Sequence, residues 1–449
     1  MLIYKKLILR SIRIFKQNHL IKSAKILTGF YVAVFSTFVH SAEPCQADTP
    51  PPVLSKEIAL NRLLQCNLDI IDSKRFILAN QANLTMSGQT QNPNLTVGVG
   101  SINPKLGIGS GAYFDKTIDT SIRYEQLIER GHKRELRIKS AQGQVAAAKE
   151  DVLDVERQQS IALLKAMVDL AAVSERVNLL SQVVALYDET LHANAVRAEK
   201  GDLPPIDVQR QKIDANRAEI ELRQANADKK VAQLTLATLL TWESKADLLA
   251  VDSSILEVTP LESNNFSVTN RADIKAAQLR LEAAKVQVDL AQAQLKSDIT
   301  AGVQYDHWPT SASNSTGTGD TVSFTVGIPI TLNHRYEGEI ALANSNYDAA
   351  REALTHIEEI AKAEWQRINA DVASAETNLQ ILQKEQLPRA EDVARTVELG
   401  YKKGALDLLD LLDARRMLRQ TRLDTLAARA GLARAILARN QLISANNIN

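Results

Sequence analysis

Cysteine, aromatic residues and net charge are all scarce in this chain. Its 449 residues include 2 cysteines, only 4% are aromatic, and the formal net charge at pH 7 is zero. Two cysteines cannot make a disulfide framework, although Cys45 and Cys66 could form one bond in an exported protein. A balanced charge gives no argument for a nucleic-acid surface. The abundance of Ala, Leu, Gln, Glu, Lys and Arg after residue 130 is instead typical of long helices.

Long hydrophobic runs are also absent, except near the N-terminus. There, several Lys and Arg residues precede an apolar run from Ile26 to Val39, followed by the small residues Ser41 and Ala42. This order predicts a secretory signal peptide over residues 1–42. An uncleaved anchor is the alternative, but the run is shorter than the roughly 20 apolar residues that a spanning helix needs. Because no other stretch could form a transmembrane helix, a membrane location would require strands.

The rest of the chain divides into two similar halves. Residues 43–54 form a linker, 55–242 a first repeat, 243–270 a connector, 271–445 a second repeat and 446–449 a tail. Each repeat is expected to hold a helix, two strands and a long helical hairpin. Matching segments recur about 202 to 204 residues apart, which indicates an internal duplication. The matched segments are Asn67–Ile70 with Arg271–Ile274, Ile128–His132 with Ile330–His334, Gly201–Leu203 with Gly404–Leu406, and Asp207 with Asp410.

The helices of the first repeat are readable from caps and spacing. Ser55 is expected to cap one helix that continues to about Gly88. Further on, apolar residues keep three-to-four spacing, and no proline lies between Gly131 and Pro204. This predicts a coiled-coil helix of roughly 65 residues, on the order of 100 Å long. The chain then turns at residues 201–205 and returns as a second helix.

Four segments alternate apolar residues with small or polar ones: 95–101, 118–124, 299–305 and 322–328. Such strands fit a membrane β-barrel with a polar lumen, whereas a small soluble sheet packed on the helices is the alternative. Four strands cannot close a barrel wide enough to hold water, so the barrel interpretation requires several copies of the chain. The apolar faces are formed by Ile118, Ile122 and Tyr124, by Ile299, Val303 and Tyr305, and by Val322, Phe324, Val326 and Ile328.

The segment 400–417 carries the clearest functional pattern. Its two glycines interrupt a helical pattern that resumes at once with leucines, so a tight helix–turn–helix is expected. Asp407, Asp410 and Asp413 follow at steps of three, which brings neighbouring carboxylates close together on the second helix. On a lone helix these carboxylates repel one another. Around a symmetry axis shared by several copies, they would form stacked negative rings that favour cations.

Together these features resemble the TolC-like outer membrane efflux protein family. The residues that carry the resemblance are Asn92–Leu95, Gln126–Arg134, Pro388, Gly400-Tyr401-x-x-Gly404, and the Leu-Leu-Asp-Leu-Leu-Asp-Ala run at 408–414. The family fold is mostly α with a small β part. It implies a homotrimer in which each chain gives four strands to one twelve-stranded outer-membrane β-barrel and coiled-coil hairpins to a periplasmic α-barrel. The motif spacing is closest to the CzcC-like heavy-metal efflux branch.

The resemblance also implies a function and partners. The chain would be the exit duct of a tripartite efflux system, passively conducting substrates such as heavy-metal cations from the periplasm to the exterior. Its partners would be a periplasmic adaptor (membrane fusion) protein, an inner-membrane transporter of the RND type and outer-membrane lipid, with no nucleic acid. The alternative is a non-channel coiled-coil adaptor or structural protein of the periplasm.

The implied site residues lie at the hairpin ends. Asp410 and Asp413 match the family's positions for carboxylate rings at a constriction, although ordinary solvated helix charges are the alternative. Tyr401 and Asp207 lie at matching ends, where a phenol–carboxylate hydrogen bond could hold the tips closed. Helix capping gives the tip glycines a purely local alternative. The positions implied for adaptor docking are Gly201, Asp202, Leu203, Gly404, Ala405 and Leu406.

No catalytic pattern is present in the sequence. There is no nucleophile elbow, no phosphate-binding glycine loop and no cluster of metal ligands, and the histidines are scattered without ligand spacing. We therefore expect no enzyme activity, no cofactor and no resident metal. A duct need not bind its cargo, so a metal substrate remains compatible with this expectation.

Overall fold

The computed structural model describes residues 45, 49–102, 104–105, 107–112, 116–261, 267–309 and 319–446. The expected signal peptide of residues 1–42 and nearly all of the expected tail lie outside the described residues. Contacts divide the chain into Met1–Cys45 and Gln46–Asn449, and every element below belongs to the second unit. Cys45 and Cys66 are both disulfide-bonded. None of the helices within the described residues combines the length and hydropathy of a membrane-crossing segment.

The first repeat contains α2 (Lys56–Cys66), α3 (Leu68–Gly88), α4 (Lys133–Glu199) and α5 (Pro205–Leu240). The predicted long helix is confirmed, since α4 has 67 residues. The expectation of one helix from Ser55 to Gly88 is wrong, because Asn67 ends α2 and caps α3. Its Oδ1 accepts hydrogen bonds from the backbone N–H groups of Asp69 and Ile70 at 3.1 and 3.2 Å. The chain therefore bends where the sequence suggested a continuous helix.

The four strands form one antiparallel sheet in the order β1 (Asn94–Gly100), β2 (Asp119–Ile128), β3 (Ile299–Trp308) and β4 (Gly319–Gly327). The pairing of β2 with β3 joins the two repeats. The register aligns Ile122 with Tyr305 and Val322, and this confirms that the predicted apolar residues share a face. On that face Phe324 is 83% exposed. The sheet thus presents an apolar surface that no described element covers.

The second repeat follows a connector of short 3₁₀ helices, η2 (Glu243–Leu248), η3 (Ser253–Leu256) and η4 (Val268–Asn270). It comprises α6 (Ala272–Ala293), α7 (Glu337–Ile381), the π-helix η5 (Leu382–Gln386), α8 (Leu387–Lys402) and α9 (Leu408–Asn446). The duplication is visible in the backbone as well, because His132 and Tyr336 both precede a long helix with left-handed φ values of 58° and 56°. These two residues are 204 positions apart, so the structure pairs His132 with Tyr336 and not with His334, which the expected match of Ile128–His132 with Ile330–His334 places opposite it.

The π-helix separates α7 from α8 where the first repeat has one continuous helix. Pro388 lacks an N–H group, and in a regular α-helix its ring would clash with the carbonyl of residue 384. The wider turn is closed by a bond from the Leu387 N–H to the Leu382 carbonyl. Such a bulge accommodates proline without ending the helix. In the second hairpin, the arm that precedes the tip therefore consists of two α-helices, α7 and α8, joined by the π-helix.

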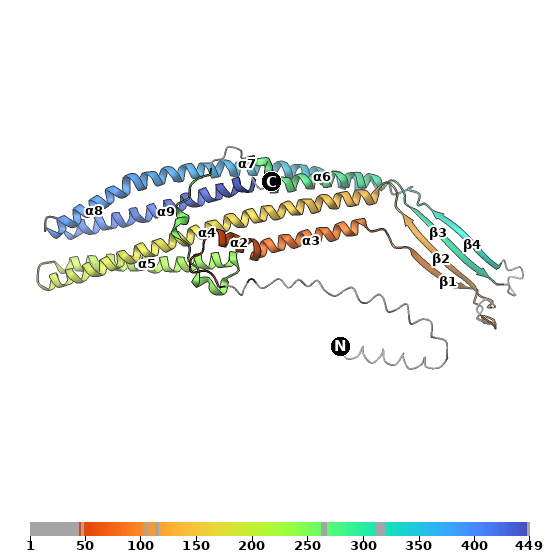
Figure 1. Cartoon of the computed structure of the whole chain (residues 1–449), viewed down its shortest axis with the longest axis horizontal. Coiled ribbons are helices and arrows are strands. Elements are labelled where there is room, and N and C mark those ends of the chain that lie inside the picture. Colours follow the sequence, from red (N-terminus) through yellow and green to blue (C-terminus); the bar gives the residue numbers. More distant parts are fainter. Residues whose placement is uncertain are drawn as a thin grey trace. The chain divides into compact units, whose positions relative to one another are not determined.

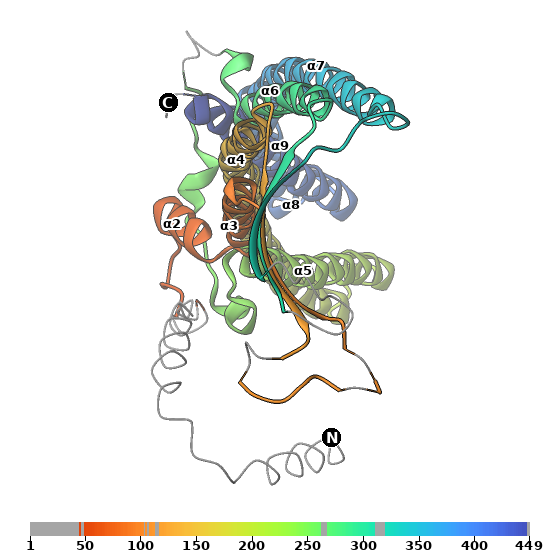
Figure 2. The same cartoon turned by 90° about the vertical axis from the view of Figure 1, so that its right-hand side faces the viewer.

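Helices from both repeats follow one curve, and α8 and α9 lie on its concave side (Figure 2). In Figure 2, α7, α6, α4, α3 and α5 follow this curve, while α2 and the connector lie on its convex side. The main hydrophobic core lies between α4, α5, α9, α2 and the connector, around Leu163, Met167, Leu240 and Trp242. The tips of the two hairpins, α4/α5 and α8/α9, lie at the end of the bundle away from the sheet (Figure 1). This arrangement brings together the two segments that carry the predicted site.

Candidate functional site: the paired hairpin tips

The first tip ends α4 in a Schellman motif. Gly201 adopts the left-handed φ of 83°, which suits a residue without a Cβ. The Asp202 N–H donates to the Arg197 carbonyl at 2.9 Å, and the Gly201 N–H donates to the Ala198 carbonyl at 3.0 Å. Leu203 is buried, whereas Gly201 and Asp202 are exposed. The two prolines that follow occupy the cap and first position of α5, where a missing N–H costs little.

The second tip has the same construction. Gly404 has a φ of 72°, the Ala405 N–H donates to the Gly400 carbonyl at 2.9 Å, and the Gly404 N–H donates to the Tyr401 carbonyl at 3.0 Å. Leu406 folds back over Gly400, so a Cβ added at Gly400 would lie 2.6 Å from Leu406 Cδ1. The capping bonds give both tip glycines a local structural role. The exposed backbone and side chains around them remain available to a partner.

The carboxylates at the start of α9 cap the helix. The Asp410 N–H donates to Asp407 Oδ1 at 2.9 Å, and the Asp407 N–H donates to Asp410 Oδ2 at 3.4 Å. This reciprocal pair is a capping box, a role for Asp407 that sequence reasoning missed although the acid-x-x-acid spacing was its signal. In α5, Asp207 lies at the corresponding third position, and its carboxylate pairs with Arg210 at 3.4 Å. The two tips thus share an acidic residue at the third position of the following helix, Asp207 in α5 and Asp410 in α9.

A buried hydrogen-bond chain connects the two hairpins near their tips. The Tyr401 hydroxyl of α8 donates to Asn194 Oδ1 of α4 at 3.1 Å, and Asn194 Nδ2 donates to Gln211 Oε1 of α5 at 2.9 Å. Arg197 donates to the same hydroxyl at 3.1 Å. The expected bond between Tyr401 and Asp207 is not formed within the described chain. Asn194 and Arg197 already occupy the accepting and donating roles of the hydroxyl, so sequence reasoning chose the wrong intrachain partner.

A buried ion pair lies one turn deeper. Arg416 of α9 places Nε 3.2 Å from Asp214 Oδ1 and Nη2 2.6 Å from Asp214 Oδ2. Its remaining Nη1 donates to Asp413 Oδ1 at 2.8 Å. Asp214 is 3% exposed and Asp413 is 62% exposed, so one guanidinium links a buried carboxylate to an exposed one. The hydrogen bond to Asp214 raises the pKa of Arg416 above its usual value. Neither Asp214 nor Arg416 was singled out from sequence.

A small hydrophobic cluster holds this polar region in place. It contains Tyr187, Ala215, Ala218, Leu408, Leu411 and Leu412. The Tyr187 hydroxyl is buried and has no hydrogen-bond partner among the described residues. Burial therefore raises the pKa of Tyr187, since the charged phenolate would be poorly solvated there. The cluster packs the start of α9 against α4 and α5.

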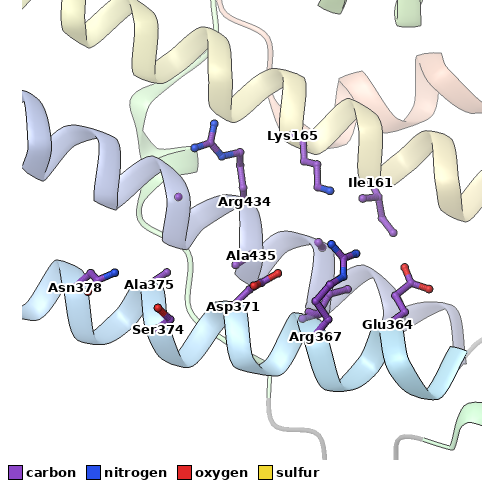
Figure 3. A pocket seen from close by; sticks show the side chains of 13 residues that line it. Ile161, Lys165, Glu364, Arg367, Asp371, Ser374, Ala375, Asn378, Arg434 and Ala435 are labelled. Carbon is purple, nitrogen blue, oxygen red and sulfur yellow. The ribbon is translucent and has the colours of Figure 1, made fainter. Parts of the chain in front are cut away.

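A groove of about 470 Å³ lies further along the bundle, between α4, α7 and α9. Lys165 and Ile161 lie on the α4 face opposite Leu163 and Met167, so the groove opens away from the convex side that carries α2. Figure 3 shows charged side chains from all three helices around it. The charged residues of the lining are Lys165, Glu364, Arg367, Asp371 and Arg434.

Charged side chains of the groove are held by ion pairs with residues outside it. Glu364 accepts a hydrogen bond from Arg271 at 2.8 Å, and Arg434 pairs with Asp169. Burial by itself would lower the pKa of Arg271, but its bonds to Asp273 and Glu364 more than offset this and raise it. Across the described part of the chain, no group of three or more His, Cys, Asp or Glu side chains could hold a metal ion. The groove and the tips therefore offer charge but no ligand set.

Comparisons of the sequence with known proteins find similarity to outer-membrane efflux proteins. The profile of the outer membrane efflux protein family matches residues 267–445. The cobalt-zinc-cadmium resistance protein CzcC of Cupriavidus metallidurans is 22% identical over 300 residues, which cover 66% of this chain and 70% of that protein.

Solved structures show the same fold. The outer membrane protein VceC of Vibrio cholerae has a TM-score of 0.68 at 18% identity, over 86% of this chain and 95% of VceC. The open-state structure of the MtrE outer membrane channel of Neisseria gonorrhoeae has a TM-score of 0.68 at 15% identity, over 86% of this chain and 88% of MtrE.

Proposed function

This chain belongs to the outer membrane efflux protein family and is an outer-membrane efflux channel, and we propose that it serves as the passive exit duct of a tripartite heavy-metal efflux system. The family consists of transport channels. In this proposal the protein has no catalytic step of its own, and its inner-membrane partner supplies the energy. The helical hairpins extend into the periplasm and the sheet lies in the outer membrane.

The observation that carries the proposal is the two-faced sheet. One face aligns Leu95, Tyr124, Val303 and Phe324 across all four strands, and these side chains are between 38% and 83% exposed. The adjacent row of paired residues points to the opposite face and consists of Thr96, Arg123, Gln304 and Ser323. An apolar outer face and a polar inner face are what a membrane barrel with a wet lumen requires. A periplasmic rod or adaptor has no need for an uncovered apolar sheet.

The strand edges support assembly with further copies. Within the described strands, β1 and β4 each pair on one side only. Unpaired backbone groups at a sheet edge cannot be tolerated in lipid, so these edges must meet other strands. Edge-to-edge pairing of β4 of one copy with β1 of the next would close a barrel. We propose a homotrimer, the assembly of the family.

An unpartnered seam on α5 supports the same assembly. Ile206, Ile213, Ile220 and Leu234 recur at multiples of seven residues and are 59, 54, 65 and 44% exposed. A heptad seam of this kind is stable only when a second helix covers it. We propose that a helix of the adjacent copy does so in the α-barrel.

The tips are the proposed constriction and docking surface. The exposed Asp410 and Asp413 would face the axis of the trimer and narrow it, and Tyr401 and Asp207 would belong to the same gate as residues that hold the tips. The tip residues named above as docking positions would receive a periplasmic adaptor protein, with the buried Leu203 supporting the loop beneath the exposed ones. These positions are Gly201, Asp202, Leu203, Gly404, Ala405 and Leu406. Their matched Schellman geometry supports this, because the two tips of each chain would offer an adaptor equivalent surfaces. An inner-membrane transporter of the RND type would complete the system.

Heavy-metal cations are the proposed cargo. Support comes from the relationship to CzcC, a cobalt-zinc-cadmium resistance protein, and from the run of carboxylates at the second tip. Because a duct conducts without holding its cargo, this proposal needs no metal centre in the chain. The direct test is whether deleting the gene lowers the cobalt, zinc or cadmium concentration that cells tolerate, with re-expression restoring tolerance. Unchanged tolerance to all three metals would reject the cargo but leave the channel itself intact.

Conductance tests the constriction. Detergent-purified trimers in a planar bilayer should give small, cation-preferring openings, and Asp410→Ala/Asp413→Ala should lose the preference. Assembly is tested separately with Ile213→Glu/Ile220→Glu, which should abolish trimers in native gels, against Ile213→Leu/Ile220→Leu as a matched control that keeps them. A trimer that forms in both pairs of variants would remove the α5 seam from the proposed interface.

A further inference from the structure

Arg416 is shared between two carboxylates of different exposure. Its Nε and Nη2 bind both oxygens of Asp214, which is buried, and Nη1 binds Asp413, which is exposed. A guanidinium can serve two carboxylates at once because its donors form a rigid planar fork. The buried Asp214 therefore fixes where the positive charge sits, and that position is beside Asp413.

The neighbouring arginines of α9 are engaged elsewhere. Arg415 donates to Thr190 at 3.0 Å, and Arg419 pairs with Glu221 at 3.5 Å. Arg217, the other basic group near Asp214, lies 4.0 Å from it and is 66% exposed. Among the described ion pairs, Arg416 is thus the cation held against Asp413. Asp410 has no basic partner in these pairs and instead caps α9.

We propose that Arg416 determines the cation selectivity of the constriction by neutralising Asp413, so that Asp410 carries most of the effective negative charge. The proposal rests on the constriction proposed above. Asp214 acts as a positioning residue, because it holds the guanidinium from the buried side. A negative ring attracts cations in proportion to its uncompensated charge, and a counter-charge at hydrogen-bond distance removes most of that attraction.

The test measures reversal potentials of purified full-length trimers in a salt gradient. Arg416→Gln should raise the cation-to-anion permeability ratio by about twofold or more, since it exposes an uncompensated carboxylate. Arg416→Lys should stay near wild type because the charge is kept. Arg422→Gln is the matched control, because it removes the same charge from α9 at an exposed pair with Glu391, and it should leave the ratio unchanged.

Coupling to Asp413 separates a charge effect from a structural one. In an Asp413→Asn background, Arg416→Gln should no longer raise the ratio. The effect should also shrink between 0.1 M and 1 M salt, where the screening length falls from about 10 Å to about 3 Å. A rise that persists without Asp413, or no rise in folded trimers, would overturn the proposal. If Asp410→Ala/Asp413→Ala leaves selectivity unchanged, the constriction itself is misplaced.

A second variant is needed because Arg416→Gln leaves Asp214 buried without its main partner, which can disrupt folding. Asp214→Asn/Arg416→Gln keeps the total charge of the three groups at −1 but takes the cation away from Asp413, so it should raise the ratio by less than Arg416→Gln alone. Carboxyl labelling with a carbodiimide and an amine, read by mass spectrometry, requires no open channel. Asp413 should label faster in this double variant than in wild type, relative to the exposed Asp202. Equal labelling of Asp413 in both proteins would contradict the compensation.

Discussion

The hydroxyl of Tyr401 in α8 donates a 3.1 Å hydrogen bond to Oδ1 of Asn194 in α4, a residue 207 positions earlier in the chain. Asn194 is 2% exposed and passes the connection on to Gln211 of α5, which is fully buried. This contact joins the second hairpin to the first through groups that have few other partners. Buried polar groups of this kind are costly to leave unsatisfied, so the contact fixes the relative position of the tips.

Tyr401→Phe should therefore loosen the second hairpin. The loss of the hydroxyl leaves Asn194 Oδ1 buried without its donor, at a cost of about 1–3 kcal/mol. Hydrogen exchange of backbone amides in 387–415 should become faster, while exchange in the sheet stays unchanged. Tyr347→Phe, on the half-buried face of α7, is the control and should change neither region. Unaltered exchange at the tip in Tyr401→Phe would mean that hydrophobic packing alone holds the hairpin.

Tyr187→Phe should instead increase the free energy of unfolding. Its hydroxyl is buried without a partner among the described residues, so its removal relieves a desolvation cost, and we expect a gain of about 1 kcal/mol. Burial also raises the pKa of Tyr187 above its ordinary value of 10.0. Tyr187 therefore ionises at a lower pH in the unfolded chain than in the folded protein. Its titration leaves the free energy of unfolding unchanged below pH 10 and lowers it as the pH rises further.

Thermal unfolding of the purified protein as a function of pH measures both effects. The melting temperature of Tyr187→Phe should exceed that of wild type at pH 8, and the gap should widen above pH 10. A gap that narrows in alkaline solution would show that the Tyr187 hydroxyl ionises more easily in the folded state, contrary to its burial.

Gly400→Ala should strain the second tip. The new Cβ would lie 2.6 Å from Cδ1 and 2.9 Å from Cγ of Leu406, so the leucine must move, at a cost of about 1–3 kcal/mol. Gly431→Ala is the matched control in α9, where nothing lies within 4 Å, and alanine should stabilise the helix by roughly 0.5–1 kcal/mol. Proteolysis at the tip should rise in the first variant only. Equal protease resistance would show that Leu406 can rotate away freely.

Phe324→Arg and Ser323→Arg test the two faces of β4. Phe324 lies on the apolar face and should contact lipid, so its replacement should destabilise the membrane-embedded protein by about 2–4 kcal/mol. Ser323 is its neighbour on the polar face and pairs with Gln304, so arginine there should alter conductance with little effect on stability. Denaturant unfolding from lipid vesicles compares them. If both substitutions destabilise equally, the two faces do not differ in their contact with lipid.

Local sequence patterns predict much of the architecture. The 67-residue helix α4 follows from the absence of proline and the regular apolar spacing, and the shared face of Ile122, Tyr305 and Val322 follows from strict alternation. The matched tips follow from glycine at equivalent positions, because only the left-handed conformation ends both helices in this way. Two local features that sequence reasoning missed each depend on one side chain: Asn67 divides α2 from α3, and Pro388 accompanies the π-helix before α8.

The sequence by itself therefore determined the duplication, the long hairpins, the strand faces and the positions of the tip carboxylates, because each depends on residues close together in the chain. Tertiary structure alone decided the partners of those residues. Tyr401 was expected to bind Asp207 but binds Asn194, and Arg416 joins Asp413 to an aspartate 202 residues away in sequence. Such pairs depend on how two hairpins from different repeats lie against each other, and no local periodicity records that packing.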